Sequence, residues 1–238
     1  MIKRFRMIAG PNGSGKSTLI GWLHDDYSVN FYTLLNADDI LAHLLKTGAY
    51  SPKFPVSKED LVRYAEATDY GEDVKSIFRG ESVAVETDCV RFKREAINSY
   101  TVALFTNFLQ ECCLRRGESF SQETVFSHPS KVEAIRRAFE LGYRTYLYFI
   151  ATASPEISKC RVANRHARGG HDVPSDKIDS RYFRSIGQLK AALPYLSRAY
   201  AFDNSGSEMI FLGEYEQGAG WQFAKSVDEL PRWFVNAL

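Results

Sequence analysis

Strand-like and helix-like spacings of hydrophobic residues alternate along the first part of the chain. Lys3–Ala9 is a short apolar run that predicts a strand, and Lys16–His24 has the spacing of a helix. A second apolar run, Phe31–Asn36, predicts another strand, and the helix after it is expected to continue to about Lys46 and end at Gly48. The chain therefore begins with two strand–helix units.

Helical spacing dominates the middle of the chain. Ser57–Phe78 is predicted to be largely helical, and its first residues, Ser-Lys-Glu-Asp, can form a capping box. Arg91–Arg115 also carries apolar residues at helical spacing, and Gly117 ends this predicted helix. We therefore expect residues 48–118 to form a helical insertion.

Strands and helices alternate again in the second half. The predicted strands cover Ser119–Val125, Arg144–Ala151, Ala199–Phe202 and Ile210–Glu214, and the predicted helices cover Ser130–Leu141, Pro155–Arg168, Pro174–Arg198 and Val227–Asn236. Because helices separate the strands, the pattern predicts an α/β fold, a parallel sheet with helices on both faces. We see no repeat or long linker, so we expect one domain over residues 1–238.

One short segment between the first strand and the first helix carries the most specific motif. Residues 10–18 read Gly-Pro-Asn-Gly-Ser-Gly-Lys-Ser-Thr and match G-x-x-x-x-G-K-[ST], the phosphate-binding loop or Walker A motif. The glycines let successive backbone N–H groups face a phosphate, and the following helix adds its positive N-terminal dipole. A Gly-rich turn that binds nothing is the alternative. The strand before and the helix after the segment favour a nucleotide site, because the motif requires that context.

This motif predicts ATP and Mg²⁺ as cofactors and a P-loop NTPase or kinase-like fold. Lys16 supplies a positive charge for the outer phosphates, and Ser17 supplies a hydroxyl for Mg²⁺. The predicted nucleotide-binding residues are Gly10, Pro11, Asn12, Gly13, Ser14, Gly15, Lys16, Ser17 and Thr18.

Acidic residues follow two of the predicted strands. Ligands of open α/β sheets bind beyond the carboxyl ends of the strands, which is where Asp38, Asp39 and Glu123 are expected to lie. We interpret Asp38 as the base that takes a proton from a substrate hydroxyl, and Asp39 as a helix cap or supporting group. Glu123 is interpreted as a ligand of substrate hydroxyls or of a Mg²⁺-bound water. The alternatives are plain N-capping for the aspartates and a solvated side chain for Glu123.

Basic residues cluster on one predicted helix. Arg161, Arg165 and Arg168 are spaced i, i+4 and i+7 and so share one helical face. Gly169-Gly170 follows as a hinge, which predicts a mobile lid whose arginines, chiefly Arg165 and Arg168, stabilise charge in the transition state. A solvated basic face is the alternative.

Two further polar side chains are candidates for the same site. We interpret His171 as a lid contact rather than a proton carrier, because a carboxylate base is already present. Asn204 follows a late strand and is predicted to lie beside the adenine, although a plain turn explains its position nearly as well.

Composition narrows the class of protein. The chain has 238 residues, of which 45% are hydrophobic and 25% charged, and its net charge of +1 provides no field that would recruit nucleic acid. No apolar run approaches the ~20 residues of a membrane span, and the phosphate loop begins too near Met1 to leave room for a signal peptide. The four cysteines lack metal-ligand spacing, so we expect reduced thiols, Cys112 on a buried helix face, and a cytoplasmic protein without a membrane partner.

The order of these motifs resembles the zeta toxin family of kinases. The resemblance covers about residues 1–205 and is carried by residues 10–18, Asn36-Ala-Asp-Asp39, Glu123-Thr-Val125, Arg161-Val-x-x-Arg165, Gly169-Gly-His-Asp-Val-Pro174 and Ile178-x-x-Arg181-Tyr.

The resemblance implies a P-loop kinase that uses ATP and Mg²⁺. Known members of the family phosphorylate the 3′-hydroxyl of the sugar in UDP-N-acetylglucosamine. By this likeness Lys16 binds phosphates, Asp38 is the general base and Glu123 helps to hold the substrate, while Arg165 and Arg168 stabilise the transferring phosphoryl group. It also implies a small helical antitoxin that blocks the nucleotide site.

Several functions therefore stay open. The first is a kinase of UDP-N-acetylglucosamine or a related nucleotide sugar, and the second is a kinase of another metabolite or of a nucleic-acid end. The third is a partner-regulated ATPase or switch, although the chain lacks the Asn-Lys-x-Asp of guanine switches and the Leu-Ser-Gly-Gly-Gln of ABC motors. Nucleotide binding without catalysis is the fourth, and the presence of both Lys16 and Asp38 argues against it.

Overall fold

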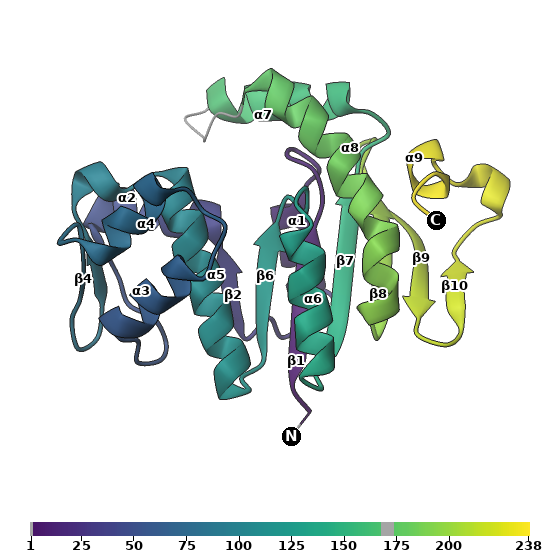
Figure 1. Cartoon of the computed structure of the whole chain (residues 1–238). Coiled ribbons are helices and arrows are strands. Elements are labelled where there is room, and N and C mark those ends of the chain that lie inside the picture. Colours follow the sequence, from purple (N-terminus) through teal and green to yellow (C-terminus); the bar gives the residue numbers. More distant parts are fainter. Residues whose placement is uncertain (1, 168–173) are drawn as a thin grey trace. The chain divides into compact units, whose positions relative to one another are not determined.

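The computed structural model describes residues 2–167 and 174–238. The chain forms two compact units, which we describe separately (Figure 1). Unit 1 comprises Met1–Tyr32 and Ser121–Leu238, and unit 2 comprises Thr33–Phe120. The phosphate loop and Glu123 belong to unit 1, and Asp38 belongs to unit 2.

Unit 1 contains the strands and helices that surround the phosphate loop. In chain order they are β1 (Arg4–Ala9), α1 (Lys16–Asp25), β6 (Phe120–Thr124, whose first residue falls in unit 2), α6 (Ser130–Glu140), β7 (Arg144–Ala151), α7 (Pro155–Ala167), α8 (Ser175–Ala192), the 3-10 turn η2 (Leu193–Tyr195), β8 (Arg198–Asp203), β9 (Ile210–Glu216), β10 (Gly220–Phe223), the 3-10 turn η3 (Val227–Glu229) and α9 (Arg232–Val235).

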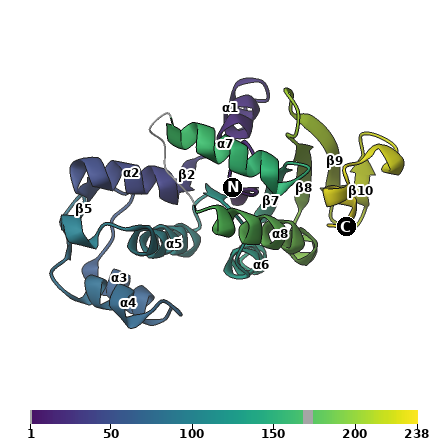
Figure 2. The ribbon, with the colours of Figure 1, turned by 90° about the horizontal axis from the view of Figure 1, so that it is seen from above.

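The strands of unit 1 form a mixed sheet in the order β10-β9-β8-β7-β1-β6. β1 pairs in parallel with β7, and β7 pairs in parallel with β8. The C-terminal strands β9 and β10 are antiparallel additions at one edge. Seen from above, α1 lies on one face of this sheet and α6 and α8 lie on the other (Figure 2). The predicted fold class is therefore confirmed, with an added antiparallel hairpin.

The central strands of unit 1 are buried on both faces. Met7 and Ile8 of β1 and Leu147 and Phe149 of β7 are each 0% exposed. Strands covered by helices on both faces need apolar side chains at successive positions, which is why the last three residues of β1 and the last five residues of β7 are uninterrupted hydrophobic runs. Burial of each such side chain contributes about 1.5–3 kcal/mol, so the phosphate loop starts from a well-packed strand end.

Unit 2 contains the elements from β2 to α5. They are β2 (Thr33–Asn36), α2 (Ala37–Thr47), β3 (Ala49–Tyr50), α3 (Lys58–Glu66), α4 (Glu72–Arg79), β4 (Val83–Val85), β5 (Val90–Phe92), the 3-10 turn η1 (Arg94–Ala96) and α5 (Ser99–Arg116). The short strands form an antiparallel sheet in the order β3-β5-β4.

The predicted helix over Arg91–Arg115 is wrong in its first part. The chain instead forms β5 and η1 before α5 begins. In β5 the side chains of Val90 and Phe92 are buried while Arg91 is exposed, which is the alternation of a strand. The side chain of Asn98 accepts backbone N–H groups of the first turn of α5 and so fixes where that helix starts.

Two other predicted helices are interrupted. Ser57–Phe78 forms α3 and α4 as separate helices. One half of the predicted capping box is confirmed, because Ser57 Oγ accepts the N–H of Asp60 at 3.0 Å. Val227–Asn236 is divided into η3 and α9, with Pro231 as the N-cap residue of α9. Proline has no backbone N–H to donate, so a helix cannot run through it without losing a hydrogen bond.

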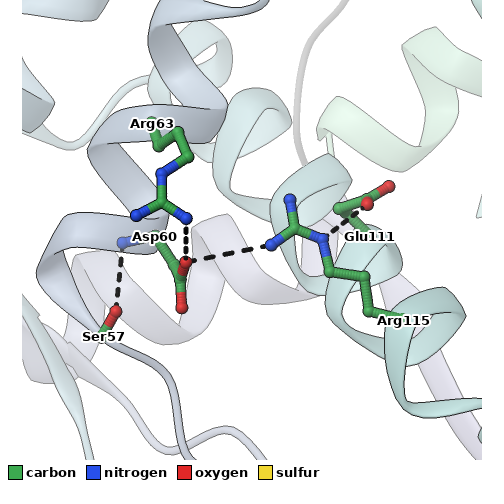
Figure 3. A network of polar contacts seen from close by, with 5 residues as sticks. All are labelled: Ser57, Asp60, Arg63, Glu111 and Arg115. Carbon is green, nitrogen blue, oxygen red and sulfur yellow. Dashed lines mark hydrogen bonds and ion pairs between the residues drawn. The ribbon is translucent and has the colours of Figure 1, made fainter.

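A polar network connects α3 and α5 within unit 2 (Figure 3). Asp60 Oδ1 accepts a hydrogen bond from Arg63 Nη1 at 3.2 Å and lies 3.9 Å from Arg115 Nη1. Arg115 in turn donates from Nε to Glu111 Oε1 at 2.8 Å. The Glu111 side chain is only 6% exposed, so this arginine offsets the charge of an almost buried carboxylate.

The four cysteines are all unpaired thiols. Of the adjacent pair on α5, Cys113 is the buried residue and Cys112 is half-buried, which corrects the expectation for Cys112. Burial raises the pKa of Cys112 to about 11 and that of Cys113 to about 12, which keeps both in the unreactive thiol form. In the described part of the chain, every helix is too short or too polar to cross a bilayer.

Candidate nucleotide site

The phosphate loop joins the end of β1 to the start of α1 in unit 1. Gly13 and Gly15 have φ angles of +73° and +98°, which other residues rarely adopt. A Cβ atom added at Gly13 would lie 2.6 Å from the carbonyl oxygen of Ser158. A Cβ atom added at Gly15 would lie 2.3 Å from Nδ2 of Asn204. The loop therefore needs glycine at both positions for its conformation and for the close approach of its neighbours.

Lys16 lies back over the loop that precedes it. Its Nζ atom donates to the carbonyl oxygens of Gly10 and Pro11, each at 3.1 Å, and the residue is 9% exposed. These contacts hold the positive charge of Lys16 beside the loop. Ser17 and Thr18, the next residues of α1, are exposed.

Other side chains of the loop are buried. Asn12 is 7% exposed and Ser14 is 0% exposed. The Oδ1 atom of Asn12 and the Oγ atom of Ser14 are buried without a hydrogen-bond partner in the structure. Unsatisfied buried polar atoms are uncommon in folded proteins, and those of a ligand-binding loop can be satisfied when the ligand is bound.

Asn204 contacts the phosphate loop directly. Its Nδ2 atom donates to the carbonyl oxygen of Ser14 at 2.8 Å, and its backbone N–H donates to Ala151 at the end of β7 at 2.8 Å. The sequence predicts that Asn204 lies beside the adenine or forms a plain turn. The structure adds a third role, which is support of the phosphate loop. A contact with adenine stays a prediction.

Glu123 lies near the end of β6, next to β1 in the sheet of unit 1. The two strands point the same way (Figure 1), so the carboxyl end of β6, which includes Glu123, lies at the edge of the sheet from which the phosphate loop emerges. The residue is half-buried, whereas Gln122 before it is 2% exposed. Its position at this edge is compatible with either interpretation made above.

The arginines of α7 occupy different surroundings. Arg161 donates from Nη1 to the carbonyl oxygen of Asn204 at 2.6 Å and from Nη2 to that of Gly206 at 3.2 Å. Arg165 is exposed on the same helix. Arg161 therefore supports the segment that contacts the phosphate loop. Arg168 and the predicted lid residues Gly169, Gly170 and His171 lie outside the described residues.

Asp38 and Asp39 lie in the first turn of α2, in unit 2. The cap of that helix is Asn36, whose Oδ1 atom accepts the N–H of Asp38 at 3.0 Å, so capping is not the role of Asp39. Both aspartates are exposed at the helix N-terminus. Partial desolvation of its carboxylate at the helix terminus, followed by the charge of Asp38, raises the pKa of Asp39, while a hydrogen bond with Asn36 opposes the rise.

Across residues 2–167 and 174–238, no three His, Cys, Asp or Glu side chains gather as a ready-made metal site. A P-loop does not need such a group, since Mg²⁺ takes most of its ligands from phosphate oxygens and water. The exposed hydroxyl of Ser17 in the first turn of α1 fits that limited requirement.

Sequence reasoning missed how the loop is supported. The contacts of Arg161 and Asn204 join residues that are far apart in the chain, and no spacing rule predicts them. Trp233 of α9 also reaches this region, because its indole N–H donates to Asp203 at 2.7 Å. The polar sequence Asp-Asn-Ser at the end of β8 is the one signal in the sequence for the contacts of Arg161 and Asn204. No signal in the sequence predicts the contact of Trp233.

Family comparison agrees with the loop geometry. The sequence model of a family described as an AAA domain matches residues 6–182. The chain belongs to this AAA-domain family. A comparison with curated proteins finds no match. The matched range includes the phosphate loop and the first part of α8.

Solved structures share the fold of this AAA-domain protein. A chain of the AvrRxo1-ORF1:-ORF2 complex with ATP is 15% identical, with a TM-score of 0.56 over 94% of this chain and 61% of that chain. The native AvrRxo1-ORF1:-ORF2 complex gives 17% identity and a TM-score of 0.54 over 94% and 62% of the two chains. A chain of the PezAT chromosomal toxin–antitoxin system of Streptococcus pneumoniae is 14% identical, with a TM-score of 0.49 over 85% and 68%. The protein thus spans less than two thirds of its AvrRxo1 relatives.

Proposed function

We propose that this protein is an ATP-dependent kinase that transfers the γ-phosphoryl group of ATP to a hydroxyl group of a small molecule. The observation that carries the proposal is the phosphate loop between β1 and α1, with glycines at positive φ and Lys16 lying over it. The family match and the ATP in the AvrRxo1 complex support ATP as the nucleotide.

In this proposal the loop and α1 bind the triphosphate. Backbone N–H groups of the loop and the ammonium group of Lys16 contact the phosphates, and Ser17 contributes a hydroxyl to Mg²⁺, which neutralises charge on the transferring group. Arg165 and Arg168 would stabilise the charge that develops in the transition state. Arg165 is exposed on α7.

The acceptor is proposed to be UDP-N-acetylglucosamine or a related nucleotide sugar. This assignment rests on the resemblance of the motif order to the zeta toxin family. Asp38 would take the proton of the attacking hydroxyl, and Glu123 would hold the sugar. The exposed position of Asp38 at a helix N-terminus leaves its carboxylate open to a substrate.

A regulatory partner follows from the same resemblance. We infer that a small antitoxin protein binds this kinase in the cytoplasm. Two relatives are named as two-component assemblies, AvrRxo1-ORF1:-ORF2 and the PezAT toxin–antitoxin system, although neither name identifies a partner of this chain.

Mass spectrometry of a metabolite extract incubated with the protein, Mg²⁺ and ATP tests the proposal. We expect one metabolite class to gain a single phosphoryl group, with nucleotide sugars first among the candidates. Lys16→Ala should abolish this gain. ATP hydrolysis that only a partner protein stimulates, with no phosphorylated metabolite, would instead indicate a regulated ATPase.

A further inference from the structure

The C-terminal helix α9 packs on the sheet of unit 1, beside Asp203, the residue before Asn204. Trp233 of α9 packs against Phe149 of β7, with 5.8 Å between the ring centroids. Its indole Nε1–H donates to Oδ2 of Asp203 at 2.7 Å, and both residues are 5% exposed. A hydrogen bond to a buried carboxylate is among the stronger ones in a protein, because neither group can turn to water instead.

Asp203 uses its second carboxylate oxygen to shape the turn after β8. Oδ1 accepts the backbone N–H of Ser205 at 2.9 Å. The Oγ atom of Ser205 accepts the N–H of Ala153 at 2.7 Å, and the N–H of Asn204 donates to Ala151 at 2.8 Å. The backbone on both sides of Asn204 is therefore held in place, with Asp203 as the link between this turn and α9.

Asn204 connects this ordered turn to one peptide group of the phosphate loop. Its Nδ2 atom donates to the carbonyl oxygen of Ser14 at 2.8 Å. In a planar trans peptide the C=O and N–H groups point in opposite directions. A fixed Ser14 carbonyl therefore aims the N–H of Gly15 away from Asn204, toward the inside of the loop where a phosphate binds.

We propose that Asp203, Asn204 and Trp233 form a C-terminal latch that positions the Gly15 N–H for nucleotide phosphate. The latch rests on the proposed nucleotide-binding function and gives a role to the segment after residue 205. Its three members are positioning residues, since they act through the Ser14–Gly15 peptide. Without the indole donor, Asp203 keeps a buried carboxylate oxygen that Trp233 no longer pairs, and the turn that carries Asn204 loosens.

Trp233→Phe tests the latch, with Trp221→Phe as its matched control. Both tryptophans lie in the C-terminal part of the chain and contact Phe234, but the buried Nε1 of Trp221 has no hydrogen-bond partner in the structure. Calorimetry with ATP and Mg²⁺ should give a dissociation constant about tenfold higher for Trp233→Phe than for Trp221→Phe. Thermal unfolding should show a larger loss of stability for Trp233→Phe, because only this change leaves a buried carboxylate oxygen unpaired, so ATP affinity is measured well below both melting temperatures. Equal ATP affinities in the two variants would overturn the latch.

A double-mutant cycle separates the latch from a general loss of packing. In an Asn204→Ala background the route to Ser14 is already broken, so Trp233→Phe should weaken ATP binding no further. Losses that simply add would overturn the proposed route. Asp203→Asn is the second variant if Trp233→Phe does not fold. Whichever way its amide turns, one of the two N–H donors loses its acceptor, and the same loss of affinity is expected. Wild-type protein that binds no ATP would refute the proposed function itself, whereas the outcomes above refute only the latch.

Discussion

The two units of this protein use similar local chemistry for different ends. Lys16 in unit 1 and Lys58 in unit 2 each donate from Nζ to two backbone carbonyl oxygens, those of Gly10 and Pro11 in one case and of Gly80 and Val83 in the other. In unit 1 the carbonyls belong to a single loop between a strand and a helix. In unit 2 they belong to the short connection from α4 to β4, 22 and 25 residues from Lys58 in the chain. The first arrangement can exchange carbonyls for a phosphate, whereas the second connects parts of the fold.

Substitution of these two lysines is the strongest test of that contrast. Lys16→Ala removes the charge proposed to contact the phosphates, so phosphoryl transfer should fall by about a thousandfold or more. Lys58→Ala should lower the free energy of unfolding and leave transfer per folded molecule near the wild-type rate. Initial rates with labelled ATP, together with urea unfolding, measure both effects. Equal losses of transfer in the two variants would remove the distinction between the units.

Asp38 tests whether unit 2 also contributes to the chemistry. Asp38→Asn keeps the size of the side chain but removes the proposed base, so turnover should fall by about a hundredfold or more while ATP affinity stays unchanged. Asp39→Asn serves as the control, with a smaller expected loss. Rate measurements at saturating ATP and acceptor, combined with calorimetry, separate turnover from binding. Wild-type turnover in Asp38→Asn would show that the base has been assigned to the wrong residue.

Two glycines with similar backbone angles, one in each unit, allow a comparison with a smaller expected effect. Gly13 in the phosphate loop and Gly48 at the end of α2 have similar φ angles, +73° and +69°. A Cβ atom at Gly13 would meet the carbonyl oxygen of Ser158 at 2.6 Å, whereas at Gly48 the nearest atom is at 3.6 Å, an ordinary contact. Gly13→Ala should weaken ATP binding about tenfold or more, because the loop must shift as well as bear the strained φ. Gly48→Ala should cost only about 1 kcal/mol of stability. ATP titration and thermal unfolding of both variants make the comparison.

The contrast between the two units also explains which parts of the structure could be predicted from the sequence. The phosphate loop could be predicted because its motif is contiguous, and β7 because its last five positions form one buried apolar run. In unit 2 the strands β3, β4 and β5 are two or three residues long, too short to show any periodicity, so the helical spacing that follows β5 wrongly extends the predicted helix into it. The support of the loop by Asn204 and Trp233 depends on residues brought together only by the folded sheet, which no local pattern records.

The network of Figure 3 tests unit 2 alone. Arg115→Ala leaves the carboxylate of Glu111, whose side chain is 6% exposed, without its arginine. We expect the free energy of unfolding to fall by about 1–2 kcal/mol, less than for a fully buried pair because Arg115 is half-exposed. Arg63→Ala breaks an exposed ion pair with Asp60 and should cost less than about 0.5 kcal/mol. Urea unfolding of the two variants would contradict this account if they lost equal stability.

The smallest expected effect is a change in how stability depends on pH. Burial lowers the pKa of Lys131 in unit 1 from 10.5 to about 8. Between these values the unfolded chain binds more protons at this residue than the folded chain, so the free energy of unfolding should rise as the pH increases from about 8 to 10.5. Lys131→Met should remove that part of the rise, and Lys58→Met should act in the same sense in unit 2, where burial also lowers the pKa. Urea unfolding at a series of pH values measures both slopes. Slopes that neither substitution changes would mean that each ammonium group stays as well solvated in the folded protein as in the unfolded chain.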